Sequence, residues 1–168
     1  LASRVGAAPR LAIVSGSGLA DLVVGARLTH RLDYSEIPFF PSTGVEGHPG
    51  ILVTGRIAGY SVCVLQGRVH IFEGFSPQEV VFPVRTAAYW GVAEFVVTNA
   101  AGAVNPAFKP GDLMLIRDHI NLTGENPLFG PNLDALGPRF PDLTQAYDAE
   151  SSQVLLDVAA GLNIPLRE

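Results

Sequence analysis

The chain has 168 residues, which is enough for one domain with a hydrophobic core, and 48% of them are hydrophobic against 16% charged. Its net charge of −5 is spread along the sequence without a basic stripe, so a nucleic-acid-binding protein is not expected. A single cysteine, Cys63, excludes an intrachain disulfide and a thiolate metal cluster, and it favours a cytoplasmic setting.

The first fourteen residues, LASRVGAAPRLAIV, resemble a weak signal peptide but lack a convincing cleavage region. We therefore expect a tail that leads into a strand. Because the chain starts at Leu1 rather than at Met, we expect it not to be a complete translation product. Every apolar run is interrupted by Gly, Pro or charge well short of a bilayer span, so no membrane partner is expected. The apolar balance indicates instead that a partner subunit buries part of the surface.

The first half of the chain predicts a strand, a turn and a hairpin. Leu11 to Val14 is a buried strand that opens into the turn Ser15-Gly16-Ser17-Gly18, with a helix starting at about residue 19. A long loop rich in Gly and Pro covers residues 36–50, and loops of this length are typical of functional segments. Residues 51–54 and 60–65 flank a turn over residues 55–59, the pattern of a hairpin.

The second half alternates helices and strands. Ser76, Pro77 and Glu79 form a helix entry with a capping box, which predicts a helix to about Trp90 that is kinked at Pro83. Further elements are expected as strands at residues 94–98 and 112–116, a long loop at 121–141 and an amphipathic helix at 151–162. Alternating elements with nearly continuous apolar strands predict a single α/β domain over residues 1–168, with its sheet covered on both faces. Such sheets bind ligands outside the carboxyl ends of their strands.

The turn over residues 15–18 has the chemistry of an anion site. Glycine lets backbone N–H groups converge, Ser17 adds a hydroxyl, and the following helix would direct its positive end at the ligand. The turn lacks the Lys-Ser/Thr of a Walker A loop and the third glycine of a dinucleotide fingerprint. An ordinary strand-to-helix turn fits the same residues.

The segment from Gln66 to Gly74 also suits an anion. Arg68 and His70 are two residues apart, so an extended backbone would present both side chains on one face. Arginine binds phosphate oxygens in a bidentate manner, histidine can donate beside it, and Glu73 is near enough to hold the guanidinium. A surface ion pair beside an unrelated histidine is the alternative interpretation.

Two further segments carry small residues around a polar group. His48 lies between Gly47 and Pro49-Gly50, which indicates either a fixed ring or a solvated loop histidine. The turn Thr98 to Ala103 follows a buried strand and can bind an anion through its N–H groups, although close helix packing needs the same residues. The four histidines lack metal-binding spacing, so no metal is expected. Cys63 is interpreted as a core side chain.

Taken together and in this order, the segments resemble the purine nucleoside phosphorylases of the trimeric kind, a family that includes the methylthioadenosine phosphorylases. The matching segments are Gly16-Ser17-Gly18-Leu19, Glu36-Ile37-Pro38, Gly47-His48, Gln66-Gly67-Arg68 with His70 and Glu73-Gly74, Phe82-Pro83-Val84-Arg85, Val97-Thr98-Asn99-Ala100-Ala101-Gly102, Gly111-Asp112 with Arg117-Asp118-His119-Ile120-Asn121, and Arg139-Phe140-Pro141 with Ala146-Tyr147-Asp148. The string Gln66-Gly67-Arg68-Val69-His70 favours the purine phosphorylases. The resemblance implies a nucleoside phosphorylase fold, with a mixed central sheet flanked by helices on both faces.

The resemblance also implies roles for individual residues. Catalysis would depend on Arg68 and His70, and phosphate would be bound by Ser17, His48, Arg68, Val69, His70 and Ala100. The residues implied near the ribose are Phe72, where the family usually has tyrosine, Asn99, and Phe140, which would reach the nucleoside pocket of a neighbouring subunit. Ala103 stands where the family often has glycine.

The implied activity is that of a purine-nucleoside phosphorylase, a glycosyltransferase of the pentosyltransferase type. It would convert purine (2′-deoxy)ribonucleosides and inorganic phosphate to the free base and (2-deoxy)ribose 1-phosphate, as a cytoplasmic homotrimer of purine salvage without a cofactor. The chain covers roughly three-fifths of the family's length, and the family's purine-gripping residues lie beyond Glu168. The fold is therefore expected to be incomplete at its C-terminus. A catalytically inactive fragment that keeps the phosphate-binding half, and that only assembles or binds anions, is the alternative.

Overall fold

A computed structural model describes residues 1–16, 19, 27–42, 44 and 49–168. These residues form two compact units, Leu1–Ala100 with Asn126–Gly130 (unit 1) and Ala101–Glu125 with Pro131–Glu168 (unit 2). Unit 1 contains a five-stranded sheet, and unit 2 contains a two-stranded sheet. The single domain over residues 1–168 stays a prediction.

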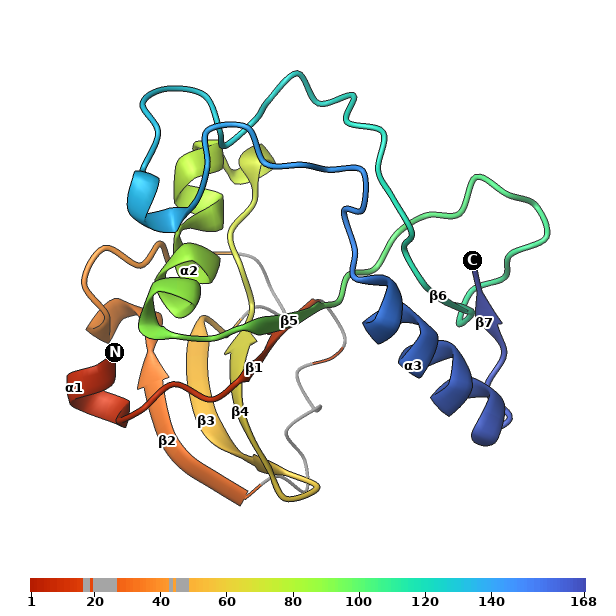
Figure 1. The fold of residues 1–168 in the computed structure, drawn as a ribbon, viewed down its shortest axis with the longest axis horizontal. Coiled ribbons are helices and arrows are strands. Elements are labelled where there is room, and N and C mark those ends of the chain that lie inside the picture. The colour runs from red at the N-terminus through yellow and green to blue at the C-terminus, as the bar shows by residue number, and fades with distance from the viewer. Residues whose placement is uncertain (17–18, 20–26, 43, 45–48) are drawn as a thin grey trace. The chain divides into compact units, whose positions relative to one another are not determined.

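The sheet of unit 1 is mixed, as expected, and its strand order is β2-β3-β4-β1-β5 (Figure 1). Strand β1 lies between β4 and β5 and is parallel to both, whereas β2, β3 and β4 pair in an antiparallel manner. The strands are β1 (Leu11–Ser15), β2 (Arg27–Asp33), β3 (Ile51–Ile57), β4 (Tyr60–Gln66) and β5 (Glu94–Val97). The carboxyl ends of β1, β4 and β5 therefore meet at one edge of the sheet.

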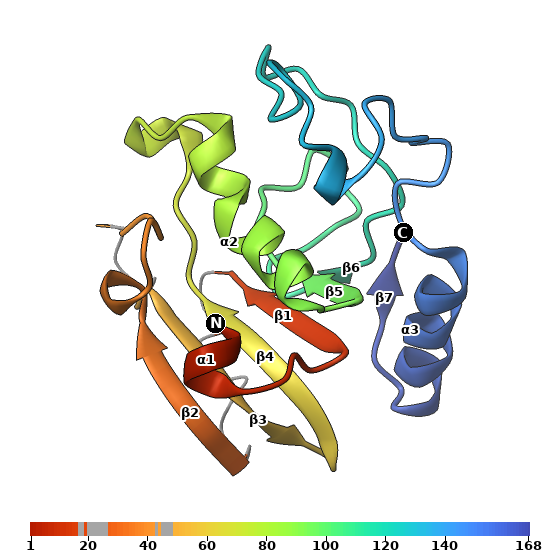
Figure 2. The same ribbon diagram turned by 60° about the vertical axis from the view of Figure 1, so that its left-hand side comes forward.

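Side chains alternate between the two faces of the sheet, because successive strand residues point to opposite sides. Ala12, Leu52 and Cys63 belong to the larger core cluster on the first face, while Val53 and Val64 belong to a second cluster on the other face. Helices α1 (Ala2–Val5) and α2 (Pro77–Trp90) both pack against the larger cluster (Figure 2). Among the described residues, the second cluster includes no helix residue. The helices expected on this face of the sheet stay a prediction.

Helix α2 confirms the expected capping box. The Ser76 hydroxyl accepts a hydrogen bond from the Glu79 N–H at 3.3 Å, and the Glu79 carboxylate accepts one from the Ser76 N–H at 2.8 Å. The helix ends at Gly91, whose φ of 124° suits glycine. Pro83 lies inside the helix, as expected, and is buried. The kink expected at this residue stays a prediction.

Three expectations for unit 1 need correction. The N-terminal tail contains the short helix α1, which the sequence analysis did not predict. Strands β3 and β4 extend into the expected turn and leave only Ala58 and Gly59 between them, both with positive φ. Two residues with positive φ are typical of two-residue hairpin turns, because such turns match the right-handed twist of the flanking strands. Strand β2 was missed because most of its side chains are exposed and it carries little apolar pattern.

Unit 2 contains helix α3 (Ala149–Gly161), a 3-10 turn at Asp134–Leu136, and strands β6 (Leu113–Met114) and β7 (Leu166–Arg167). The expected strand over residues 112–116 is thus shorter. The Asp148 side chain caps α3 by accepting from the Ser151 N–H at 2.7 Å. The apolar positions of the helix are largely exposed within the described chain, namely Val154, Leu155, Val158 and Leu162.

Candidate functional site

Three loops converge where the parallel strands of unit 1 end. Gly16 follows β1, Gly67 and Arg68 follow β4, and Thr98 follows β5. This edge is the one at which open α/β sheets bind ligands. The segments singled out from the sequence as anion-suited therefore lie together at the carboxyl edge of one sheet.

Thr98 links all three loops. Its hydroxyl oxygen accepts from the Gly16 N–H at 2.9 Å and donates to the Val14 carbonyl at 3.2 Å. Its own carbonyl accepts from Nη1 of Arg68 at 2.7 Å. The Arg68 guanidinium is therefore oriented toward the turn after β5 and lies beside the loop after β1.

Close approach of two backbones explains the glycine at position 16. A Cβ on Gly16 would lie 2.5 Å from the Thr98 carbonyl oxygen and 3.0 Å from Asn99 Cα. No side chain fits there without separating the loops after β1 and β5. The N–H of Gly16 is used by Thr98, so an anion bound at this edge must use other donors.

The turn after β1 is further stabilised by Ser15. This buried hydroxyl donates to the Leu19 carbonyl at 2.8 Å, and the Leu19 N–H donates to the Gly16 carbonyl at 3.3 Å. The Ser15 hydroxyl and the Gly16 carbonyl are thus both hydrogen-bonded to Leu19. The expected phosphate ligands Ser17 and His48 lie outside the described residues, as does most of the helix expected from residue 19.

Arg68 is only partly exposed, and burial lowers the pKa of its guanidinium from the ordinary arginine value. A partly desolvated cation interacts with an anion more strongly than one in bulk water does. The bond to Thr98 holds the planar guanidinium, which carries five N–H donors, toward the turn after β5.

His70 is held by Glu73. The Glu73 carboxylate accepts from the His70 backbone N–H at 2.8 Å and contacts the ring Nδ1 at 2.7 Å. Because a carboxylate only accepts hydrogen bonds, Nδ1 carries a proton in this contact. The Phe72 ring stacks on the imidazole with centroids 4.8 Å apart. Ring plane and tautomer of His70 are therefore both fixed; the expected contact of Glu73 with Arg68 stays a prediction.

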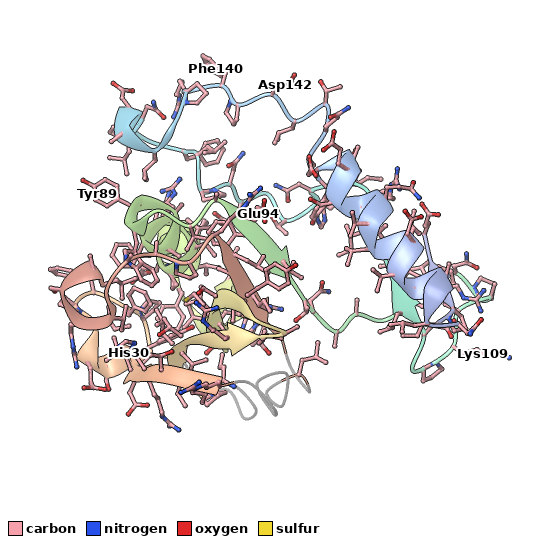
Figure 3. All side chains as sticks on the ribbon, turned by 60° about the horizontal axis from the view of Figure 1, so that its bottom comes forward. His30, Tyr89, Glu94, Lys109, Phe140 and Asp142 are labelled. Carbon is pink, nitrogen blue, oxygen red and sulfur yellow. The ribbon has the colours of Figure 1, made fainter. Side chains whose placement is uncertain are left out.

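The remaining candidates differ in exposure. Val69 as a whole residue is 1% exposed, whereas Phe72 is 78% exposed. Asn99 and Ala100 are exposed in the turn after β5. Among the described residues, no acceptor contacts the Ala100 N–H. Phe140 belongs to unit 2, where its ring projects outward from the loop before α3 (Figure 3).

Within the described ranges, no group of three or more His, Cys, Asp or Glu side chains could hold a metal ion. None of the helices in the described part of the chain is long and apolar enough to cross a membrane.

The family of the chain follows from its similarity to known proteins. Residues 10–168 match the family model of the phosphorylase superfamily. The chain belongs to this superfamily.

Curated relatives within the superfamily agree with the resemblance found in the sequence. Purine nucleoside phosphorylase 1 of Geobacillus stearothermophilus is 49% identical over 160 residues, which cover 95% of this chain and 58% of the relative. Purine nucleoside phosphorylase of Bos taurus is 50% identical over 148 residues, which cover 86% of this chain and 51% of the relative. The chain thus spans less than two thirds of the length of these relatives.

Solved structures of the superfamily have the same fold. A purine nucleoside phosphorylase isoform 2 of Schistosoma mansoni, in complex with cytosine and ribose-1-phosphate, matches with a TM-score of 0.85 and 41% identity. That match covers 95% of this chain and 58% of the other. A second Schistosoma mansoni enzyme, in complex with acetate, matches with a TM-score of 0.91 and 38% identity over 99% of this chain and 63% of the other. The expected nucleoside phosphorylase fold is confirmed.

Two residues that organise the edge were not assigned roles from the sequence. Thr98 was read only as the start of a small-residue turn, and Tyr34, whose hydroxyl donates to the Gly67 carbonyl at 2.9 Å, was not singled out. A threonine directly after an apolar strand and before a turn of small residues was a usable signal for the first. Nothing in the local sequence indicated the second, because its partner lies 33 residues away.

Proposed function

We propose that the protein is a purine nucleoside phosphorylase. It converts a purine ribonucleoside or 2′-deoxyribonucleoside and inorganic phosphate to the free base and ribose 1-phosphate or 2-deoxyribose 1-phosphate. The observation that carries the proposal is the convergence of Arg68, Thr98 and Gly16 at the carboxyl ends of three parallel strands. The similarity to purine nucleoside phosphorylases supports the choice of substrate.

In this reaction phosphate itself is the nucleophile. One phosphate oxygen attacks C1′ while the bond from C1′ to the purine nitrogen breaks, and the electron pair of that bond leaves with the base, which takes up a proton. The protein must hold the phosphate dianion beneath C1′ as positive charge develops on the sugar. Inorganic phosphate is a co-substrate, and neither a metal nor an organic cofactor takes part.

Each candidate residue has a role in this proposal. Arg68 provides the charge contact to phosphate, and His70, fixed by Glu73, orients a phosphate oxygen. The N–H groups at Val69 and Ala100 add neutral donors. The other proposed ligands are Ser17 and His48 for phosphate, Asn99 and Phe72 near the ribose, and Phe140 at the pocket of a neighbouring subunit.

The proposal extends to the assembly and setting of the protein. The chain is the phosphate-binding part of one nucleoside phosphorylase domain, which works as a homotrimer in cytoplasmic purine salvage. Leaving-group activation and the grip on the purine belong to the portion of the relatives that this chain does not cover. The name "full-length protein" is used for residues 1–168 extended by that portion of a relative.

A second candidate function is binding of anions by a catalytically inactive chain. The observation that favours it is the exposed apolar surface of α3, which would be expected where covering structure is absent. Such a chain would bind phosphate at Arg68 yet release no base. The two candidates therefore differ in turnover and agree in phosphate binding.

The test compares phosphate binding with base release. Phosphate affinity is measured by calorimetry on the 168-residue chain, and hypoxanthine release from inosine is followed for this chain and for the full-length protein. We expect binding by both and turnover only by the full-length protein. Turnover by neither supports the anion-binding alternative, and absence of phosphate binding from both contradicts both candidates.

Substitution of Arg68 makes the test specific to the edge. Arg68→Ala in the full-length protein removes a charge-assisted contact, so kcat/KM for phosphate should fall roughly 10- to 150-fold. Arg10→Ala is the matched control, because Arg10 pairs with Glu94 in an exposed ion pair at the opposite ends of β1 and β5. Equal effects of the two substitutions would mean that Arg68 is an ordinary surface residue.

A further inference from the structure

Tyr34 is rigidly placed at the end of β2. Its side chain is 2% exposed, and its backbone N–H donates to the Gly50 carbonyl at 2.8 Å. The backbone carbonyl accepts from the Ile37 N–H at 3.0 Å. The ring meets the Phe40 ring edge-on, with centroids 5.1 Å apart. The backbone hydrogen bonds and the ring contact thus hold the Tyr34 phenol in one position.

The hydroxyl of this fixed ring reaches the turn that carries Arg68. It donates to the Gly67 carbonyl at 2.9 Å. Gly67 is buried, and its φ of 90° places it in the left-handed region that favours glycine. Since this carbonyl and the Arg68 N–H belong to the same planar peptide, the hydrogen bond fixes the peptide from which the Arg68 side chain starts.

Arg68 is consequently held at both ends. Tyr34 orients its peptide, and Thr98 accepts from its guanidinium at 2.7 Å. Burial raises the pKa of the Tyr34 hydroxyl, so the group stays a donor throughout the neutral range. Without the hydroxyl, the buried Gly67 carbonyl would lose this donor and the peptide could rotate to find another.

We propose that Tyr34 is a positioning residue for phosphate, acting through the Gly67 carbonyl on the orientation of Arg68. The inference rests on the proposed function, because it assumes that Arg68 binds phosphate. It adds that the orientation of the guanidinium is set by a buried residue directly after β2, outside the proposed set of phosphate ligands.

The test is Tyr34→Phe in the full-length protein, which keeps the ring packing and removes only the hydroxyl. We expect KM for phosphate to rise roughly 5- to 30-fold, the effect of losing one buried hydrogen bond, while KM for the nucleoside stays within twofold. A residue with only a structural role would lower thermal stability without this split between the two KM values. The matched control is Tyr60→Phe, since Tyr60 is 76% exposed at the hairpin end of β4.

Phe40→Leu is the second variant, because it loosens the Tyr34 ring and leaves the hydroxyl in place. It should raise KM for phosphate in the same direction but less, and it carries the test if Tyr34→Phe does not fold. An unchanged phosphate KM in the soluble variants overturns the inference while the proposed function stands. If the unsubstituted protein neither turns over inosine nor binds phosphate by calorimetry, both are overturned.

Discussion

Gly16→Ala is the sharpest perturbation of the phosphate edge, because it adds one methyl group between two backbones. The new Cβ would lie 2.5 Å from the Thr98 carbonyl oxygen, whereas ordinary contact begins at 3.4 Å. The loops after β1 and β5 must therefore move apart by close to an ångström. No flexible side-chain end is available to absorb the shift, since the other near atoms, Asn99 Cα and the Thr98 carbonyl carbon, are backbone too.

Stability and function should both respond to this shift. Overpacking of this kind costs about 1–3 kcal/mol, which corresponds to a melting temperature lower by about 2–12 °C for a chain of this size. The Thr98 carbonyl that moves is the one that accepts from Arg68. Because a misplacement of about 1 Å can cost on the order of 100-fold in rate, kcat/KM for phosphate should fall by about that factor in the full-length protein.

The chain offers a matched control at Gly55. A Cβ there would lie 2.6 Å from the Arg27 carbonyl oxygen and 3.0 Å from Leu28 Cα, nearly the same collision between β3 and β2. Gly55→Ala should therefore lower the melting temperature by a similar amount, yet leave kcat/KM for phosphate within twofold. Equal loss of kcat/KM in both variants would refute the link between Thr98 and phosphate binding, and an unchanged melting temperature in Gly16→Ala would refute the packing argument.

Three further predictions concern other groups of unit 1. Thr98→Val removes the acceptor of the Gly16 N–H, so the free energy of unfolding in urea should fall by about 1–3 kcal/mol, whereas Thr98→Ser should keep most of it. Glu73→Gln removes the carboxylate at His70 Nδ1, so kcat/KM in steady-state assays should fall about tenfold. Burial raises the pKa of the Cys63 thiol to about 12. The unfolded chain therefore loses this proton first, and between about pH 9 and about pH 10 this group should lower stability by at most ~1.4 kcal/mol per pH unit, a contribution that Cys63→Ala removes from denaturation curves.

Elements with a strong local signal were predictable from the sequence. Both ends of helix α2 were predicted from its capping residues. Ser76 and Glu79 mark its start, and Gly91 marks its end. Strands β1 and β5 were predicted from their apolar runs. Strand β1 lies inside the parallel part of the sheet, whereas β5 is an edge strand with mostly exposed residues in the described chain. Strand β2 could not be found in this way because its sequence, RLTHRLD, has no apolar run, and it also shifts register between Leu28 and His30.

The sequence predicted which loops form the candidate site, but it did not predict the hydrogen bonds that join them. Local chemistry identified the turns at Gly16, Arg68 and Thr98 as suited to anions, and strand topology then placed them together. The hydrogen bonds that organise them join residues 30 and 82 positions apart, Arg68 with Thr98 and Gly16 with Thr98. Sequence spacing carries no information about such partners, and the contact of Glu73 with His70 was likewise not predicted.

The central place of β1 has a consequence for the order of folding. The meander β2-β3-β4 pairs neighbours along the chain, whereas Leu11 of β1 pairs with Val62 and Glu94, residues 51 and 83 positions later. Closing such long loops is slow compared with forming a hairpin. The insertion of β1 between β4 and β5 is therefore expected as a late event, and the anion edge cannot exist before it. An anion that binds at this edge therefore binds the native state only. It should slow unfolding and leave the folding rate unchanged.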